Sequence, residues 1–244
     1  MIFVIILVTM SEQKPNTPCK TCGSRYKSIF CDLKDEQLVE LDTHKRSDFY
    51  RKGEIIFKEG AFARGLFCVN RGKVKLVRTG SSGKEQIVRF ASEGDVMGYN
   101  AMLSKQSLSV SGIVLEDASI CFVPSAQFFN LLKSDNGFSM KLLELTSKNW
   151  NHAARLITDM AQKTSKQRLA EMLLWLKETF GLDNEDCLDI VLSREEIASM
   201  VGTATEALIR LLGELKKEKL IALNGKKIKL IDIHGLVVMA DLID

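Results

Sequence analysis

The segment SREEIASMVGTATEALIRLLGELKKEKLIAL constrains the fold of this chain more than any other part. Within it, Ser193 with Glu196 and Thr203 with Glu206 each match the capping box that begins a helix. Between the two boxes stands Gly202, a residue type that commonly ends a helix. A short helix, a glycine-containing turn and a longer helix are typical of the motif that places its second helix in the major groove of DNA.

A β-hairpin is predicted directly after this motif. Asn224 and Gly225 form a pair that favours a tight turn, and alternating apolar residues follow at Ile228 and Leu230. The hairpin would lie beside the helices as a wing. Lysines gather in the second helix and in the wing, where they either neutralise DNA phosphates or remain ordinary solvated side chains. These lysines are Lys216, Lys217, Lys219, Lys226, Lys227 and Lys229.

Charge does not by itself require a nucleic-acid partner. The net charge of the whole chain is +3, and residues 163–244 carry 12 basic and 14 acidic side chains. The acidic residues cluster between Asp183 and Asp189, whereas the lysines cluster in the second helix and the wing. A basic surface is therefore expected only locally.

Short β-rich runs separated by glycines occupy residues 53–98. Their close and even spacing predicts a small antiparallel barrel or jelly roll. An immunoglobulin-like sandwich fits the same strand pattern nearly as well.

A long helix is predicted after the β-rich region, because from about Gly137 the apolar period changes from two residues to about 3.6. Its apolar seam continues for about three heptads, so one helix of about 25 residues is expected. This helix either packs on its own domain or meets a second copy in a homodimer. The seam residues are Leu143, Thr146, Trp150, Ala153, Ile157, Met160 and Thr164.

Length and composition favour two domains, because the chain has 244 residues and 45% of them are hydrophobic. The opening run MIFVIILV is shorter than the roughly 20 residues that a membrane helix needs, so no membrane partner is expected. Six scattered cysteines indicate a reducing cytoplasm. The expected organisation is an N-terminal arm with cysteines over residues 1–30, a β-roll sensor domain over 31–136, a dimerisation helix over 137–162 and a winged helix-turn-helix domain over 163–244.

The order of these elements resembles the CRP/FNR family of bacterial transcription regulators over nearly the whole chain after the N-terminal arm. The resemblance is carried by the long helix, by the motif REEIASMVGTATEALIRLLGELKKEKLI and by a series of turn residues. These are Gly53, Gly60, Gly72, Gly83, Gly94, Asp95 and Gly98. The resemblance implies an α+β chain with a cyclic-nucleotide-binding-like β-roll, a dimerisation helix and a C-terminal winged helix-turn-helix. It also implies a homodimer that binds a palindromic site in double-stranded DNA and has RNA polymerase as a partner.

The resemblance further implies that Glu206 and Arg210 read the core of each half-site. Arginine can donate two hydrogen bonds to guanine, and glutamate can accept one from cytosine. Thr205 and Ile209 depart from the family pattern, so the outer bases are not implied. Glu206 has an alternative role as the partner of Thr203 in the capping box. The predicted DNA-binding residues are Thr203, Thr205, Glu206, Ile209, Arg210, Lys216, Lys226 and Lys227.

Cyclic AMP is not expected as a ligand. Relatives that bind it place a glutamate where this chain has Tyr99, and an arginine shortly afterwards that pairs with the cyclic phosphate. No arginine occurs here between Arg89 and Arg155.

The FNR branch of the family holds an iron–sulfur cluster with three N-terminal cysteines and one from the β-roll. The corresponding residues here are Cys19, Cys22, Cys31 and Cys121. Four thiolates suit a [4Fe–4S] cluster or a tetrahedral zinc, and unliganded cysteines are the alternative. The eight residues between Cys22 and Cys31 exceed the five that are usual in the branch. No chemistry is assigned to Cys68 or Cys187.

Two other classes of function fit the sequence less well. An enzyme is not expected, because His44, His152 and His234 stand in no recognisable nucleophile motif and no phosphate-binding glycine loop is present. A ligand-sensing or protein-interaction module with the same β-roll but no DNA contacts is the alternative to a DNA-binding regulator. Salt-dependent DNA binding separates these two possibilities.

Overall fold

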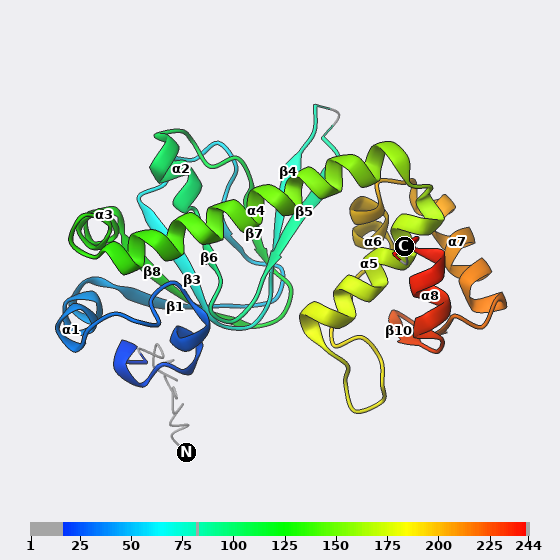
Figure 1. Cartoon of the computed structure of the whole chain (residues 1–244), viewed down its shortest axis with the longest axis horizontal. Helices are drawn as coiled ribbons and strands as arrows, with labels where there is room; N and C mark the ends of the chain where they lie inside the picture. Colours follow the sequence, from blue (N-terminus) through cyan, green and yellow to red (C-terminus); the bar gives the residue numbers. More distant parts are fainter. Residues whose placement is uncertain (1–16, 82, 243–244) are drawn as a thin grey trace, which may run out of the picture. The chain divides into compact units, whose positions relative to one another are not determined.

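The structure is a computed structural model that describes residues 17–81 and 83–242. It consists of two compact units (Figure 1). Unit 1 contains the described residues up to 76 together with 90–142, and unit 2 contains the described residues of 77–89 and those from 143 onward. The opening apolar run lies outside the described residues. Within the described part, no helix combines the length and the apolar character needed to cross a bilayer.

Unit 1 begins with an arm of two short 3-10 helices, η1 (Cys19–Thr21) and η2 (Gly23–Lys27), and then α1 (Asp35–His44). The strands are β1 (Arg46–Tyr50), β2 (Ile55–Phe57), β3 (Gly65–Arg71), β4 (Val74–Thr79), β5 (Glu85–Ala91), β6 (Val96–Met97), β7 (Ser111–Val114) and β8 (Ala118–Pro124). Two helices interrupt and follow them, α2 (Tyr99–Ser104) and α3 (Ser125–Ser134).

These strands form two four-stranded sheets, in the orders β1-β8-β3-β6 and β2-β7-β4-β5. Side chains of both sheets meet in one buried core. Val69 and Ile120 come from the first sheet, and Val74 and Val114 come from the second. Two antiparallel sheets that share a core confirm the predicted β-roll.

Helix α4 (Asn136–Gln162) is a single helix of 27 residues, as the apolar seam predicts. The boundary between the two units falls within it, after Leu142. The prediction is wrong for Thr164, which lies beyond α4 and caps the next helix, α5 (Ser165–Phe180). The Thr164 hydroxyl accepts a hydrogen bond from the Gln167 N–H, so this residue starts a helix instead of continuing one.

Unit 2 contains the predicted two-helix motif as α6 (Arg194–Val201) and α7 (Thr205–Lys217). The first capping box is confirmed. The Ser193 hydroxyl accepts from the Glu196 N–H at 3.1 Å, and the Glu196 carboxylate accepts from the Ser193 N–H at 2.7 Å. Gly202 ends α6 with a φ of 69°, a left-handed conformation that glycine adopts without strain.

The second predicted capping box is wrong. Helix α7 begins at Thr205 with Ala204 as its N-cap, and no side chain caps it. The reason is that the Thr203 N–H donates to the Ala198 carbonyl at 3.0 Å, a bond that closes the end of α6. Thr203 is therefore committed to the first helix, and no cap uses the Glu206 carboxylate.

The predicted wing is present. After α7 the chain forms β9 (Ile221–Asn224), β10 (Lys227–Leu230) and α8 (Ile233–Met239). Asn224 pairs with Lys227, so the turn consists of Gly225 and Lys226, one residue later than the predicted Asn-Gly turn. Gly225 has a φ of 57°, so glycine supplies the left-handed residue at the first position of the turn.

The outer part of the β4–β5 hairpin, the described residues of 77–89, belongs to unit 2. Ser199 of α6 joins this hairpin to the helix, because its hydroxyl donates to the Glu85 carbonyl at 3.0 Å and accepts from the Ile87 N–H at 2.8 Å. Ser199 is buried, so both bonds are shielded from water.

Candidate DNA-binding surface and cysteine-lined cavity

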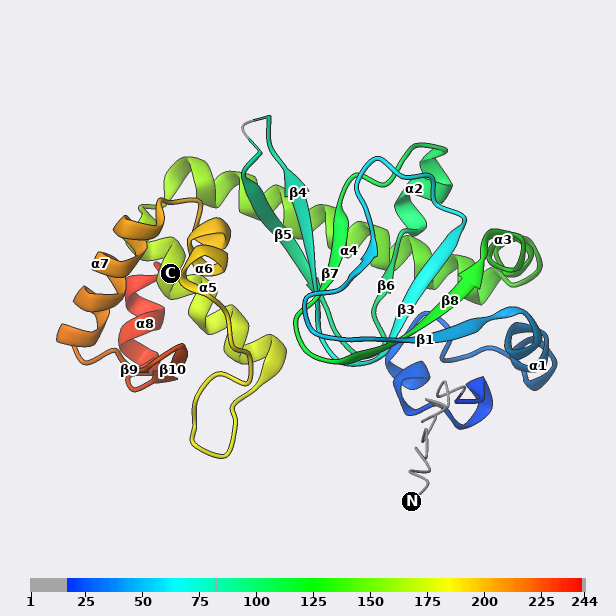
Figure 2. The same cartoon turned by 180° about the vertical axis from the view of Figure 1, so that it is seen from behind.

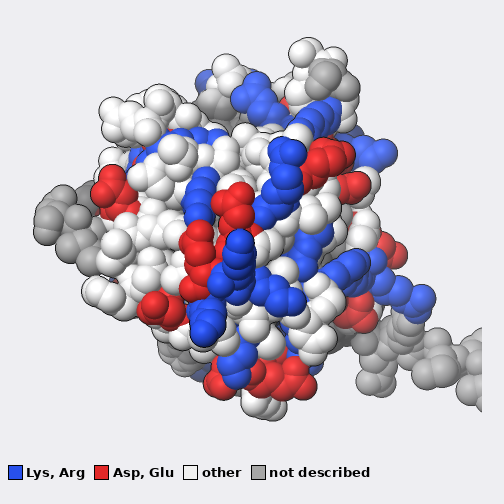
Figure 3. Space-filling view, turned by 90° about the vertical axis from the view of Figure 1, so that its right-hand side faces the viewer, with Lys and Arg blue, Asp and Glu red and all other residues white. Residues whose placement is uncertain are grey.

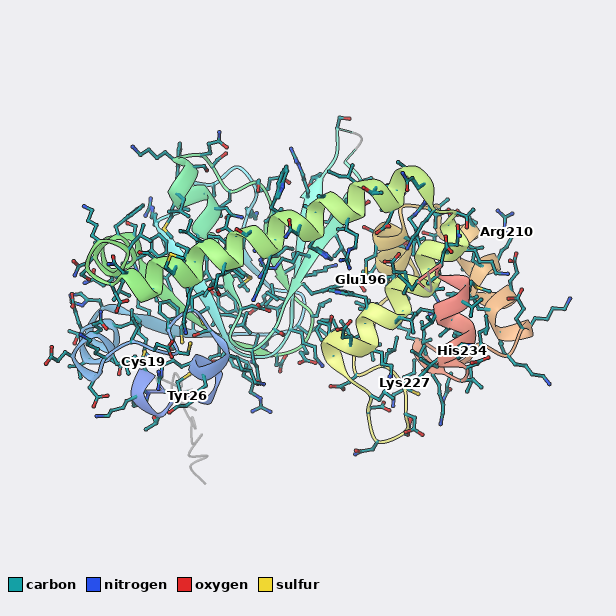
Figure 4. All side chains as sticks on the ribbon, viewed as in Figure 1. Cys19, Tyr26, Glu196, Arg210, Lys227 and His234 are labelled. Carbon is teal, nitrogen blue, oxygen red and sulfur yellow. The ribbon has the colours of Figure 1, made fainter. Side chains whose placement is uncertain are left out.

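Helix α7 has one buried face and one exposed face. Leu208, Leu212 and Leu215 are buried, since residues spaced four and three apart share one side of a helix. Glu206 and Arg210 lie one turn apart on the exposed side. Figure 4 labels Arg210 on this helix. The local sequence therefore produces a helix whose outer face carries a carboxylate and a guanidinium at neighbouring positions.

Ile209 adds apolar surface beside these charged side chains. Its aliphatic side chain is 54% exposed and does not belong to the buried core of unit 2. An exposed apolar side chain on such a helix suits contact with the methyl group of thymine. Thr203 and Thr205 lie at the entrance to the helix and are half-buried.

The predicted phosphate-binding lysines differ in their surroundings. Lys216 at the end of α7 and Lys226 in the turn of the wing are exposed. The Lys227 ammonium instead lies 2.8 Å from a Glu185 oxygen and 2.9 Å from an Asp183 oxygen. These hydrogen bonds raise the pKa of Lys227, and the two carboxylates offset its charge. Lys227 is therefore a weaker candidate for a phosphate contact than Lys226.

Acidic side chains are mixed with the basic ones on the face that Figure 3 shows. Asp183, Glu185 and the Cys187 sulfur lie within 4.8 Å of one another, yet Lys227 already occupies both carboxylates. The predicted separation of acidic from basic residues is therefore wrong for the wing, because the acidic loop pairs with Lys227 and Lys229. The exposed lysines of α7 and of the wing turn remain as candidates for phosphate contacts.

A second candidate site lies in unit 1, where four cysteines line one cavity. Cys19 and Cys22 belong to the arm, Cys68 belongs to β3, and Cys121 belongs to β8. Two basic residues, Arg25 and Lys45, also line the cavity. Figure 1 and Figure 2 show the blue N-terminal arm against these strands, and Figure 4 labels Cys19 within it.

Strand register brings two of the cysteines together. Cys68 and Cys121 are direct partners in the antiparallel pair of β3 and β8, so their side chains lie on the same face of the sheet. The adjacent residues Val69 and Ile120 point to the other face and enter the core. On the third strand, Ser47 is the partner of Cys121, and its hydroxyl lies 3.3 Å from the Cys121 sulfur.

The arm is held against the same face of the sheet by polar contacts. The side-chain amide oxygen (Oδ1) of Asn70 in β3 accepts hydrogen bonds from the Cys22 thiol at 3.2 Å and from the Ser24 hydroxyl at 3.0 Å. The Asp42 carboxylate of α1 accepts from the Cys19 N–H at 2.8 Å. These contacts place the N-terminal pair of cysteines over the strand pair.

Asp42 also pairs with Lys45, whose ammonium lies 3.0 Å from it and whose side chain is only 2% exposed. Burial raises the pKa of Cys19 to about 12. Burial also raises the pKa values of Cys68 and Cys121. Without a bound metal these thiols stay protonated at neutral pH, and a metal would have to displace their protons.

Cys31 is not part of this cavity lining. It is half-buried, and the Lys141 ammonium of α4 lies 2.6 Å from its sulfur. The structure thus brings together three of the four predicted metal ligands and adds Cys68, to which sequence reasoning assigned no role. The alternation of strand β3 marks Cys68 as facing away from the core, but no local signal shows that it faces Cys121.

We expect the pairing of Asp42 with Lys45 to hold the arm in place. Replacing Asp42 by Ala leaves the buried Lys45 ammonium without its carboxylate, which costs about 3 kcal/mol, at the low end for a buried pair because Asp42 is partly exposed. Thermal unfolding and limited proteolysis of the arm measure the effect. Asp35→Ala is the matched control, since its ion pair with Lys20 is exposed and contributes less than about 1 kcal/mol. Equal effects of the two substitutions would contradict this role of Asp42.

The prediction against cyclic AMP rests on the residue that follows Gly98 in the β-roll. Gly98 precedes α2 with a φ of 85°, and the Tyr99 side chain that follows it is fully buried. A buried phenol offers no positive charge to a cyclic phosphate. That cyclic AMP is not a ligand stays a prediction.

Two protein families match this chain. Residues 47–135 match the cyclic nucleotide-binding domain, and residues 167–239 match the Crp-like helix-turn-helix domain. The first match covers most of the β-roll, and the second covers α7 and the wing. The two candidate sites therefore lie in, or directly beside, separate domains of known type.

Curated relatives match this chain over most of its length and of theirs. The chain is 29% identical over 229 residues to electron transport regulator A of Shewanella oneidensis, covering 91% of this chain and 90% of that protein. It is 25% identical over 222 residues to the anaerobic regulatory protein of Haemophilus influenzae, covering 90% and 86%. A solved CRP/FNR family transcriptional regulator from Thermus thermophilus superposes with a TM-score of 0.68 at 25% identity, covering 80% of this chain and 98% of that one.

Proposed function

Because this chain belongs to the CRP/FNR family of transcription regulators, we propose that it acts as a homodimer on a palindromic DNA site under the control of a metal–sulfur group in unit 1. The proposed setting is the cytoplasm, where such a regulator would act together with RNA polymerase. The observation that carries the proposal is the combination of the exposed face of α7 with the cysteine-lined cavity.

The second half of α4 supports the homodimer. Its seam residues Leu143, Trp150 and Ile157 recur every seven positions and are 59%, 69% and 69% exposed in the single chain. A heptad seam exposed in this way is suited to knobs-into-holes packing with an identical helix. A two-fold dimer would present two copies of α7 to successive major grooves, about 34 Å apart.

Readout of the bases would combine three side chains of α7. Arg210 can donate two hydrogen bonds to guanine, Glu206 can accept one from cytosine, and Ile209 can contact a thymine methyl. Since no cap uses the Glu206 carboxylate, it is available for this purpose. Lys216 and Lys226 would contact phosphates and set the salt dependence of binding.

DNA binding is tested with the purified chain and a labelled duplex that carries a palindromic site selected from a random library. We expect a logarithm of the binding constant that falls linearly with the logarithm of salt concentration, with a slope of about −0.9 for each phosphate neutralised. Selected sites with two inverted half-sites one helical turn apart would support the dimer. Binding that shows neither sequence preference nor salt dependence would favour a β-roll module without DNA contacts.

The cavity suits a thiolate-bound metal group. Cys19, Cys22 and Cys68 are each only 8% exposed, and Cys121 is half-buried beside them, so the site is sheltered from water. Arg25 supplies positive charge next to four groups that would become anionic, whereas the charge of Lys45 is offset by Asp42. Cys19, Cys22 and Cys121 would hold the group together with a fourth cysteine, and a bound iron–sulfur cluster would supply oxygen-sensitive redox chemistry.

Contacts within unit 1 suggest how the arm would influence the helix. The Phe30 ring lies 5.6 Å from the Phe138 ring of α4, centroid to centroid. Lys141 of α4 contacts both Cys31 and Asp32. A change in the arm would therefore act directly on the first turns of α4, and a shift between two helix arrangements is a sufficient basis for a switch.

The sensor is tested by purification without oxygen, followed by analysis of iron and acid-labile sulfide and by an absorption spectrum. We expect iron and sulfide in the anaerobic protein, their loss in air, and a parallel fall in affinity for the palindromic site. Colourless protein without iron, from cells able to assemble clusters, would contradict the sensor. That result would not contradict the proposed DNA binding, which is tested separately with the labelled duplex.

A further inference from the structure

We infer that Cys68 of β3, and not Cys31, completes the ligand set with Cys19, Cys22 and Cys121. The inference rests on the proposed metal–sulfur group and specifies which residues of this chain hold it. Its basis is the cavity in unit 1, which these four cysteines line and which Cys31 does not.

Two of the four proposed ligands lie on neighbouring strands of one sheet. Cys68 and Cys121 are paired directly across two antiparallel strands, so their Cβ atoms are expected to be about 4.5 to 5.5 Å apart on one face of the sheet. Neither residue needs backbone movement to present its sulfur to the cavity. Two ligands on a sheet provide more precise geometry than ligands on loops.

The other two proposed ligands, Cys19 and Cys22, lie in the arm against the same face of the sheet. Cys22 donates to Asn70, which lies two residues beyond Cys68 on the same strand. The Arg25 guanidinium donates to the Cys19 carbonyl at 3.0 Å and also lines the cavity. The C-x-x-C pair is thus fixed over the strand pair by contacts that do not involve a metal.

The spacing of the sulfurs does not match a preformed zinc site. Within the described part of the chain, the acidic group around Cys187 has three ligand atoms within 4.8 Å of one another, and no three cavity cysteines do. Sulfurs around a tetrahedral zinc ion lie roughly 3.8 Å apart, as Zn–S bonds of about 2.3 Å require. Zinc would therefore require the four cysteines to move closer together.

Cys31 has a different role in the same arm. Its sulfur contacts the Lys141 ammonium, and its neighbour Asp32 forms an ion pair with the same ammonium. These two contacts hold this part of the arm on α4. Moving Cys31 into the cavity would break its contact with Lys141. Cys68 already lines the cavity.

The test compares the full chain with three single substitutions, Cys68→Ser, Cys31→Ser and Cys187→Ser, each purified without oxygen. Iron, sulfide and zinc are measured per chain. Iron is expected to fall at least about tenfold in Cys68→Ser, because even the loss of an outer partner of a metal ligand costs that much. Iron is expected to stay at the level of the parent chain in Cys31→Ser and in Cys187→Ser, whose cysteine lies in unit 2.

Folding is checked separately. The metal-free Cys68→Ser chain should unfold at the same temperature as the metal-free parent chain, and Cys68→Ala provides a second variant without a hydroxyl. An iron content equal to that of the parent chain in Cys68→Ser would overturn the inference. Loss of iron in Cys31→Ser would also overturn it, and this result is decisive even if Cys68→Ser folds poorly.

Zinc without iron in the parent chain would contradict the proposal that the metal group is an iron–sulfur cluster. A parent chain with neither metal would instead contradict the proposed sensor.

Discussion

Replacing Ile157 by Glu is expected to convert the homodimer into a monomer and to lower affinity for the palindromic site by about 10²- to 10⁴-fold. The range is the advantage that two linked binding modules have over one, and it is lost when the link is broken.

The physical reason is the position of Ile157 in the seam of α4. It follows Leu143 and Trp150 at intervals of seven, so an identical helix would bury all three in one interface. A glutamate there would place an unpaired carboxylate opposite its own copy in an apolar contact. Both the desolvation of the charge and the repulsion between the copies oppose association.

Sedimentation at micromolar concentration measures the association, and titration of the palindromic duplex measures the affinity. Lys148→Glu is the matched control, because it introduces the same side chain at an exposed position five residues after Leu143, on the side of the helix away from the seam. A dimer that survives Ile157→Glu, or a monomeric parent chain under oxic and anoxic conditions alike, would show that α4 is not the interface.

Replacing Arg210 by Ala is expected to cost about 1 to 3 kcal/mol at one base position of each half-site. The exposed guanidinium one turn after Glu206 has no role in the core of unit 2, so the cost arises from lost contacts with the base edge. Discrimination at that position should relax, while the slope of affinity against salt should change little.

Lys226→Ala is the comparison, because this exposed lysine in the wing turn is predicted to contact a phosphate. It should weaken all sequences alike and reduce the salt slope by about one phosphate. Binding to the selected site and to single-base variants, each at several salt concentrations, distinguishes the two effects. If Arg210→Ala weakens every sequence equally, Arg210 contacts a phosphate and does not read a base.

Local patterns were sufficient to predict α4 and α6. Ser193 and Glu196 are three residues apart, so their reciprocal bonds depend only on the chain between them. The seam of α4 is likewise a property of one continuous segment. Thr203 shows the limit of such patterns. The sequence predicts it as the N-cap of α7, but its N–H donates to the Ala198 carbonyl and so ends α6.

Long-range contacts explain what the sequence analysis missed. From the sequence, Lys227 and Lys226 are equally good candidates for a phosphate contact. In the structure, however, Asp183 and Glu185 of an earlier loop form ion pairs with Lys227. That loop lies more than 40 residues earlier in the chain. Its position depends on the packing of unit 2 as a whole, which no periodicity within the wing reports.

The α+β organisation, the two-helix motif with its wing, the long helix and a cysteine-bearing arm could be predicted from the chain alone, because each is encoded by residues close together in it. Which cysteines meet could not be predicted in this way, because their meeting depends on contacts between distant segments. Cys68 and Cys121 are 53 positions apart in the printed sequence, and their pairing depends on the register of β3 with β8. A shift of one residue in that register would turn one of the two side chains to the other face of the sheet, so register is set by the core that Val69 and Ile120 bury and not by the cysteines.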